Sequence, residues 1–350
     1  MKKGRLFNAL VPILAVVFGL IAGGLIMLGG GYNPFSAYAA LLNGVIGGPY
    51  FIGETIRTIT PLILTGLSVA FAFRTGLFNI GVEGQFLVGW LASVYVGIVV
   101  HAPAFIHLPL ALLAAIIAGA VWGCVPGILK ARLQVHEVII TIMMNYVALY
   151  VTNALIRNYL KAPTGERTEQ IQETASLASP FLKQITEFSR VHYGIIVALL
   201  AAVVMWFILR KTTLGFQLRS VGFNPHASRY AGMNVPRNIV LSMTISGGFA
   251  GLGGAMAGLG TYQFMMVNDA FLGIGFTGIA VALLGANTAG GVILAAILFG
   301  GLTAGGTYMQ AEAGVPTEVI KAVVALIIFF VGANYMIRWL LGRFKRGDES

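Results

Sequence analysis

The stretch RKTTLGFQLRSVGFNPHASRYAGMNVPR, residues 210–237, is a polar segment between two long apolar runs. Asn224 followed by Pro225 is typical of a helix start, because Asn accepts bonds from free N–H groups and Pro suits the first helical position. Gly232 supplies a stop about two turns later. A helix this short is marginal in water alone. We therefore expect residues 224–232 to form a short helix stabilised by docking on a partner; the alternative is an ordinary capped turn in a loop.

The composition of the chain indicates a membrane protein. Hydrophobic residues make up 57% of the chain and charged residues 10%, whereas soluble proteins contain about 25% charged residues. The net charge of +10 could indicate nucleic-acid binding, but basic residues beside apolar spans normally set membrane topology. We therefore expect no nucleic-acid partner. The single cysteine, Cys124, has no second thiol with which to form an internal disulfide.

Ten apolar runs are comparable in length to the roughly 20 residues that cross a bilayer. They cover residues 9–27, 54–73, 83–100, 108–129, 138–156, 193–209, 238–259, 272–286, 291–307 and 318–340. The first resembles a signal peptide, but it exceeds the usual apolar core of such peptides and we expect it to be retained. The sequence predicts an all-α, polytopic membrane protein with a single transmembrane domain over residues 1–350.

The distribution of Lys and Arg predicts the orientation of these spans. Most basic residues fall on the side of the N-terminus, which the positive-inside rule places in the cytoplasm. Both termini and the segment 210–237 are then cytoplasmic, and the polar segment 158–192 lies outside. The unit formed by spans two to five therefore begins outside, whereas the unit formed by spans seven to ten begins inside. Two four-helix units of opposite topology predict an inverted repeat around a central pathway.

The second informative stretch is GLFNIGVEGQ, residues 76–85, in which three glycines interrupt an apolar region. Irregular backbone at membrane depth is tolerated only where protein or a water-filled cavity satisfies it. Acidic groups at such depth are functional candidates. We therefore expect Asn79, Glu83 and Gln85 to line a substrate pathway. The alternative is a cytoplasmic turn in which Arg74 and Glu83 are solvated or paired.

Two polar residues in the fifth span extend this candidate pathway. Thr141 and Asn145 lie near one helical face. Asn145 in hydrocarbon requires a hydrogen-bonding partner, which is a substrate, water or, more simply, a neighbouring helix. The expected pathway set is therefore Asn79, Glu83, Gln85, Thr141 and Asn145.

Small residues recur at every fourth position in the seventh span. One row contains Ser246, Ala250, Gly254 and Gly258, and a parallel row contains Gly247, Gly251 and Ala255. Such stripes allow helix backbones to approach closely. They predict a packing surface.

The sequence contains no enzyme motif that we recognise. His136-Glu137 begins like the zinc-protease pattern HExxH, but position 140 is Ile, and the chain has no Gly-Lys dipeptide for a phosphate-binding loop. We expect no catalytic residue, no metal and no cofactor bound by this chain. The span interiors are nearly free of carboxylates, which ion-coupled carriers usually keep at the midplane. A transporter of this kind requires a motor on another subunit.

Four motifs together carry a family resemblance. They are GLFNIGVEGQ at 76–85, VHEVIITIMMNY at 135–146, LRSVGFNPHASRYAGM at 218–233 and GIAVALLGANTAGG at 278–291. Their order and spacing resemble the permease subunits of bacterial ABC importers of the type II group, which includes branched-chain amino acid and ribose permeases. More closely, the chain is similar to the guanosine-type nucleoside permeases of that group over essentially its full length.

The resemblance implies a set of partners. The coupling helix that docks on a cytoplasmic ABC ATPase would be formed by Asn224, Pro225, His226, Ala227, Ser228, Arg229, Tyr230, Ala231 and Gly232. ATP and Mg would be bound by that ATPase. A nucleoside, delivered by a lipid-anchored binding protein at the bacterial cell membrane, would pass between this chain and a second, different permease. The alternatives are a sugar or branched-chain amino acid permease, an ion-coupled secondary carrier, and a membrane scaffold.

Overall fold

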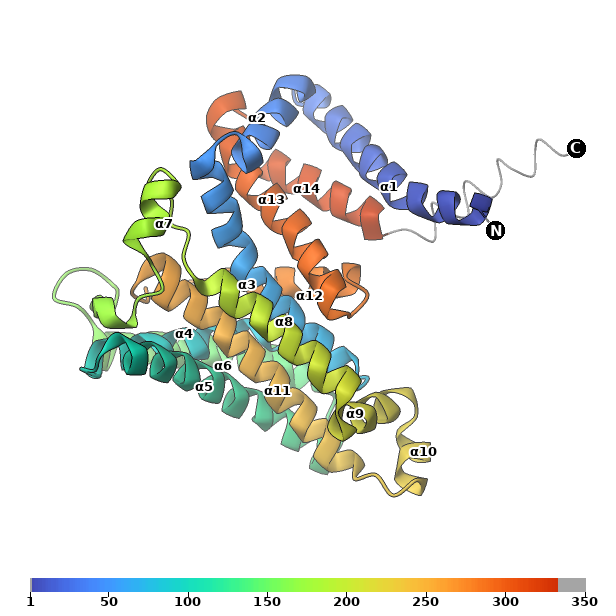
Figure 1. Cartoon of the computed structure of the whole chain (residues 1–350), viewed down its shortest axis with the longest axis vertical. Helices are drawn as coiled ribbons and strands as arrows, with labels where there is room; N and C mark the ends of the chain where they lie inside the picture. Colours follow the sequence, from blue (N-terminus) through green and yellow to red (C-terminus); the bar gives the residue numbers. More distant parts are fainter. Residues whose placement is uncertain (1, 333–350) are drawn as a thin grey trace, which may run out of the picture. The chain divides into compact units, whose positions relative to one another are not determined.

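The computed structural model describes residues 2–332, which are almost entirely helical (Figure 1). Within these residues the only β-structure consists of isolated bridges, such as Lys161 with Thr168. The predicted all-α class is therefore confirmed.

Seven helices in the described part of the chain are long and apolar enough to cross a membrane. They are α3 (Pro49–Phe73), α4 (Val82–Val99), α5 (Ala104–Leu133), α6 with its π-helical extension η1 (Glu137–Leu160), α8 (Gly194–Lys211), α11 with η3 (Val235–Tyr262) and α13 (Ala289–Ala313). Shorter apolar helices are the Val16–Gly29 part of α1 (Lys2–Gly29), α2 (Pro34–Ile46) and α12 (Ile274–Leu284). The last predicted span, 318–340, begins in α14 (Thr317–Gly332) and ends outside the described residues.

Two elements differ from the sequence prediction. Residues 272–286 do not form a full span, because α12 has 11 residues and is only about 16 Å long, compared with a hydrocarbon core of about 30 Å. Gly273 before it and Ala286 after it both adopt positive φ. In contrast, α2 was not predicted, although Asn33 and Pro34 begin it with the same Asn-Pro signal that begins the helix at Pro225.

The chain forms two compact units, of which the first is Met1–Thr55 with Gly301–Ser350. In its described part, α1 packs along α14. Glycines permit close contacts in this unit, since a Cβ at Gly19 would overlap Ile327 and one at Gly44 would overlap Tyr308. That both units belong to one transmembrane domain remains a prediction.

The second unit, Ile56–Gly300, contains a core of α4, α5 and α11 (Figure 1). The two small-residue stripes predicted in the seventh span face two different helices. A Cβ at Gly247 or Gly251 would overlap the backbone of α5, whereas one at Gly254 would overlap the carbonyl of Phe86 in α4. The predicted close packing is confirmed, and α11 is the helix on which both neighbours rest.

The polar segment 158–192 is folded onto the loop that follows α11. It contains the short helices η2 (Glu173–Ala175) and α7 (Pro180–Ile185). Backbone hydrogen bonds join Thr168 N to Met265 O at 2.8 Å and Ile171 N to Gln263 O at 3.0 Å. These hydrogen bonds hold the segment beside the end of α6, where its Glu166 pairs with Lys161 and with Arg157.

The packing of α11 on α5 generates a stability prediction. Gly251→Ala places a methyl group against the Ala115 carbonyl, and overpacking of this kind costs about 1–3 kcal/mol. We expect a lower apparent unfolding temperature in detergent. Gly290→Ala is the matched control, because nothing lies within 4 Å of its Cβ position. Equal unfolding temperatures for the two variants would contradict this account of the core.

Candidate functional site

The five predicted pathway residues are all buried, and they gather around the start of α4. Their side chains are at most 1% exposed: Asn79, Glu83, Gln85, Thr141 and Asn145. Buried polar groups at membrane depth need internal partners. The bonds they make therefore determine the local structure.

Asn79 joins three parts of the second unit. Its Nδ2 donates to Gln85 Oε1 at 2.9 Å and to Ser246 Oγ at 2.8 Å, while its Oδ1 accepts from Gly81 N at 3.0 Å. Ser246 also donates to the carbonyl of Ser68 in α3 at 2.7 Å. The irregular loop before α4 is thus bonded to α4, to α11 and, through Ser246, to α3.

Asn145 caps α4 from the neighbouring helix α6. The residue at the N-cap of α4 is Gly81, which has no side chain with which to cap the helix. Asn145 Oδ1 accepts from Gly84 N at 2.8 Å, and Asn145 Nδ2 donates to Ile80 O at 2.9 Å. One amide therefore satisfies a free N–H of the helix and a carbonyl of the loop. Thr141, one turn earlier, donates to the Val138 carbonyl of its own helix at 3.1 Å.

Glu83 performs the corresponding role for α12. Its carboxylate accepts from Gly273 N at 2.8 Å and from Gly275 N at 2.5 Å. Gly273, which precedes α12, offers no side-chain cap. A carboxylate at a helix N-terminus satisfies free N–H groups and is favoured by the helix dipole.

Arg74 binds the opposite end of α12. Its Nε donates to Asn287 O at 2.8 Å and its Nη2 to Ala286 O at 3.3 Å, in the turn after the helix. A cation at this end also suits the dipole. Burial, followed by the nearby Arg210 and Arg219, lowers the pKa of Arg74 from its usual value.

The structure thus changes the interpretation of the GLFNIGVEGQ stretch. Arg74 and Glu83 are neither simply solvated nor bonded to each other; they hold the two ends of α12. Direct contact of the five residues with substrate remains a prediction, since their polar atoms bond protein groups here. Ser68 and Arg74 were not in the predicted set. For Ser68, the available signal was Ser246 in the small-residue stripe of the seventh span, to which Ser68 is hydrogen-bonded.

The predicted short helix of the polar segment is present as α10 (Pro225–Tyr230), after α9 (Thr213–Phe223). Asn224 Oδ1 accepts from Ala227 N at 3.0 Å, and Gly232 ends the helix with a φ of +80°. Only Ser228 of α10 is buried. Tyr230 is 95% exposed and Phe223 is 90% exposed. Two exposed aromatic side chains on a short helical segment are suited to docking.

The polar segment contacts the turn that leads into the buried cluster. Gly222, near the end of α9, lies against Arg74 and Thr75, because a Cβ there would overlap their backbone atoms. Arg74 in turn holds the end of α12. A continuous set of contacts therefore joins α9 to α12.

The capping role of Glu83 generates a second prediction. Glu83→Ala leaves two buried N–H groups without their acceptor, at a cost of about 1–3 kcal/mol each. We expect faster hydrogen–deuterium exchange in residues 273–284 and a lower apparent unfolding temperature. Glu169→Ala removes an exposed carboxylate and should change neither. Unchanged exchange in α12 after Glu83→Ala would refute the capping role.

Comparison with known proteins assigns the chain to a family. A family described as "Branched-chain amino acid transport system / permease component" matches residues 51–332. The chain is 62% identical to the guanosine ABC transporter permease protein NupP of Bacillus subtilis (strain 168), over 98% of each chain. It is 42% identical to the nucleoside ABC transporter permease protein NupB of Lactococcus lactis subsp. cremoris (strain MG1363), over 97% of this chain and 94% of NupB.

A more distant relative has a different substrate in its name. The chain is 34% identical to the glucose ABC transporter permease protein TsgB13 of Haloferax volcanii, over 97% of this chain and 92% of TsgB13. All three relatives are ABC transporter permeases of nearly the same length as this chain. With seven helices able to cross a membrane among its described residues and a family match over most of its length, this multi-pass membrane protein belongs to the branched-chain amino acid transport system permease family.

Proposed function

We propose that the chain is the permease subunit of an ATP-driven importer of nucleosides and forms one half of its translocation pathway. The observation that carries this proposal is the 62% identity to a guanosine permease over 98% of both chains. The buried polar residues agree with a neutral substrate. Four of the five expected pathway residues, Asn79, Gln85, Thr141 and Asn145, are uncharged, and an uncharged polar lining suits a solute with a flat base and a hydroxyl-rich ribose.

The proposed assembly contains a cytoplasmic ATPase that binds ATP and Mg, together with a second, different permease. A lipid-anchored protein delivers the nucleoside at the bacterial cell membrane. In this arrangement both termini and α10 face the cytoplasm, and residues 158–192 face outward. The exposed aromatic residues of the α9–α10 segment support the assignment of Asn224 to Gly232 as the surface that docks on the ATPase.

The contacts of Arg74 suggest how ATPase movement reaches the pathway. Displacement of α10 moves α9, whose Gly222 lies against the backbone of Arg74. Arg74 holds the C-terminal turn of α12, and Glu83 holds its start. Movement of the coupling segment therefore shifts α12 together with the start of α4. Alternating access follows if the two orientations of this unit expose the pathway to opposite sides.

A sugar importer is the alternative function. The 34% identity to a glucose permease over 97% of this chain favours it as the second candidate. Ribose is both a sugar and a part of every nucleoside. Substrate assays must therefore include the free sugar as well as the nucleoside.

The substrate assignment predicts the outcome of an uptake experiment. Cells that carry the chain should accumulate radiolabelled guanosine faster than cells in which its gene is deleted, and adenosine, cytidine and uridine define the range of nucleosides. Ribose, glucose and leucine serve as controls. Uptake of a control that depends on the chain, without uptake of any nucleoside, would show that the substrate assignment is wrong.

Coupling to the ATPase predicts the effect of a single charge directly after α10. Ala231→Asp places an unpaired carboxylate on the proposed docking surface, and burial of such a charge costs several kcal/mol. We expect co-purification of the ATPase and nucleoside uptake to fall together. Ala104→Asp makes the same change at an exposed residue at the start of α5 and should leave both intact. Because the ATPase reaches only the cytoplasmic side, loss of co-purification would also place α10 there; retained co-purification would refute the docking role.

A further inference from the structure

A pocket of about 350 Å³ lies at the end of α6 that adjoins the polar segment 158–192. Its polar lining comes from that helix and its extension η1 (Ile156–Leu160) and from the loop after α11. The polar side chains that line it are Tyr150, Asn153, Arg157, Asn158, Asn268 and Asp269. Its volume is within the range of about 300–1,000 Å³ that is usual for small-molecule sites. None of these residues belongs to the buried cluster at the start of α4.

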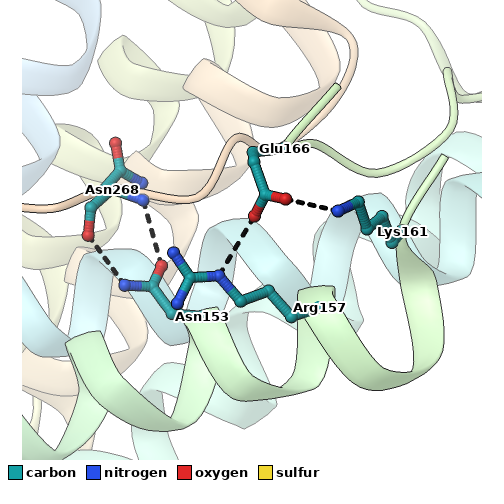
Figure 2. Close-up of polar contacts among 5 residues, drawn as sticks. All are labelled: Asn153, Arg157, Lys161, Glu166 and Asn268. Atoms are coloured by element: carbon teal, nitrogen blue, oxygen red, sulfur yellow. Dashed lines mark hydrogen bonds and ion pairs between the residues drawn. The ribbon is translucent and has the colours of Figure 1, made fainter. Parts of the chain in front are cut away.

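Two reciprocal hydrogen bonds between Asn153 and Asn268 build one wall of the pocket. Asn153 Nδ2 donates to Asn268 O at 2.7 Å, and Asn268 N donates to Asn153 Oδ1 at 3.0 Å (Figure 2). The side chain of Asn268 donates to Met266 O at 2.9 Å. These bonds fasten the loop to α6. They leave Asp269, the next residue, lining the pocket.

An ion-pair cluster holds Arg157 at the rim. Its Nε donates to Glu166 Oε2 at 3.1 Å, and Lys161 binds the other oxygen of the same carboxylate (Figure 2). Hydrogen bonds from Lys161 and then from Arg157 keep the pKa of the Glu166 carboxyl below its usual value. The guanidinium has five N–H donors, so the bond through Nε leaves the planar group with further donors at the edge of the pocket.

The charges around the pocket favour a neutral ligand. The charged residues that line the pocket are Arg157 and Asp269, one positive and one negative, and Glu166 already pairs with Arg157 and Lys161 outside the lining. An anion would approach Asp269, and a cation would approach Arg157. A neutral molecule with both donors and acceptors meets no like-charge repulsion, and it can donate to Asp269 and accept from Arg157.

The remaining lining adds an aromatic surface. Tyr150 is 67% exposed, so its ring is free to stack on a flat group. The amide of Asn158 adds one donor pair and one acceptor. A flat aromatic group joined to a hydroxyl-rich group satisfies this combination, whereas a leucine side chain would leave the amides without partners.

We propose that this pocket is a nucleoside-binding subsite at the outer end of α6. The inference rests on the proposed function for the class of ligand, and its position implies that a nucleoside binds there before it reaches the pathway. Asp269 and Asn158 bind the edges of the base or the ribose hydroxyls, and Tyr150 stacks on the base.

The test is equilibrium binding of tritiated guanosine to the complete purified transporter in lipid nanodiscs without ATP. Ala154→Phe fills the pocket, and Asp269→Asn removes its carboxylate at nearly constant shape. We expect each to weaken binding by about tenfold or more, because Asp269→Asn loses a hydrogen bond to a charged group and Ala154→Phe occupies volume that the ligand needs. Leu155→Phe, one residue further along α6, and Glu169→Gln, at an exposed carboxylate, are matched controls that should bind as the wild type does.

The possible outcomes separate this inference from the proposed function. Unchanged guanosine affinity in both pocket variants, with unfolding temperatures equal to the wild type, would overturn the subsite even if cells import nucleosides. Pocket-dependent binding of leucine rather than guanosine would overturn the ligand class. If the variants lose only the binding protein, the surface is a protein-docking site and the proposal is wrong. Pocket-dependent guanosine binding without uptake in cells would support the subsite and refute the import function.

Discussion

The second unit depends on one constraint: helix ends that begin or stop away from water must find their hydrogen-bond partners inside the protein. The start of α4 lacks its own capping side chain, and Asn145 of α6 supplies the acceptor. The start of α12 also lacks its own capping side chain, and Glu83 supplies two carboxylate oxygens as acceptors. Arg74 serves the opposite end of α12. In hydrocarbon an unsatisfied backbone group costs several kcal/mol, so these three side chains determine where the irregular segments can lie.

Such caps require unusually close approach of helices, and glycine provides it. A Cβ at Gly84 would crowd Asn145, and one at Gly275 would overlap Glu83. The same is true of Gly251, where α5 and α11 meet. The same glycines that allow close packing therefore also leave room for the capping side chains of Asn145 and Glu83.

The helix α6 connects the buried cluster with the pocket at its C-terminal end. Asn145 lies at the start of α4, and Asn153, two turns later, fastens the loop that lines the pocket. At the opposite end of the unit, Gly222 places the α9–α10 segment against Arg74. An importer that takes up solute outside and receives work from an ATPase inside needs both connections. In this chain they meet at the α4–α12 pair, which Glu83 joins.

The sequence by itself determined those features that depend on neighbouring residues or on composition. Apolar content indicated a helical membrane protein, Asn224-Pro225 with Gly232 specified the bounds of α10, the small-residue rows in the seventh span predicted its close packing, and four motifs identified the family. Only the tertiary structure decided the partners of Glu83 and Asn145, which lie 190 and 61 residues away along the chain. It also decided that residues 272–286 form a short capped helix rather than a span. The physical reason is that a cap within one helix follows from local residue order, whereas a cap supplied by another helix depends on which backbones pack together.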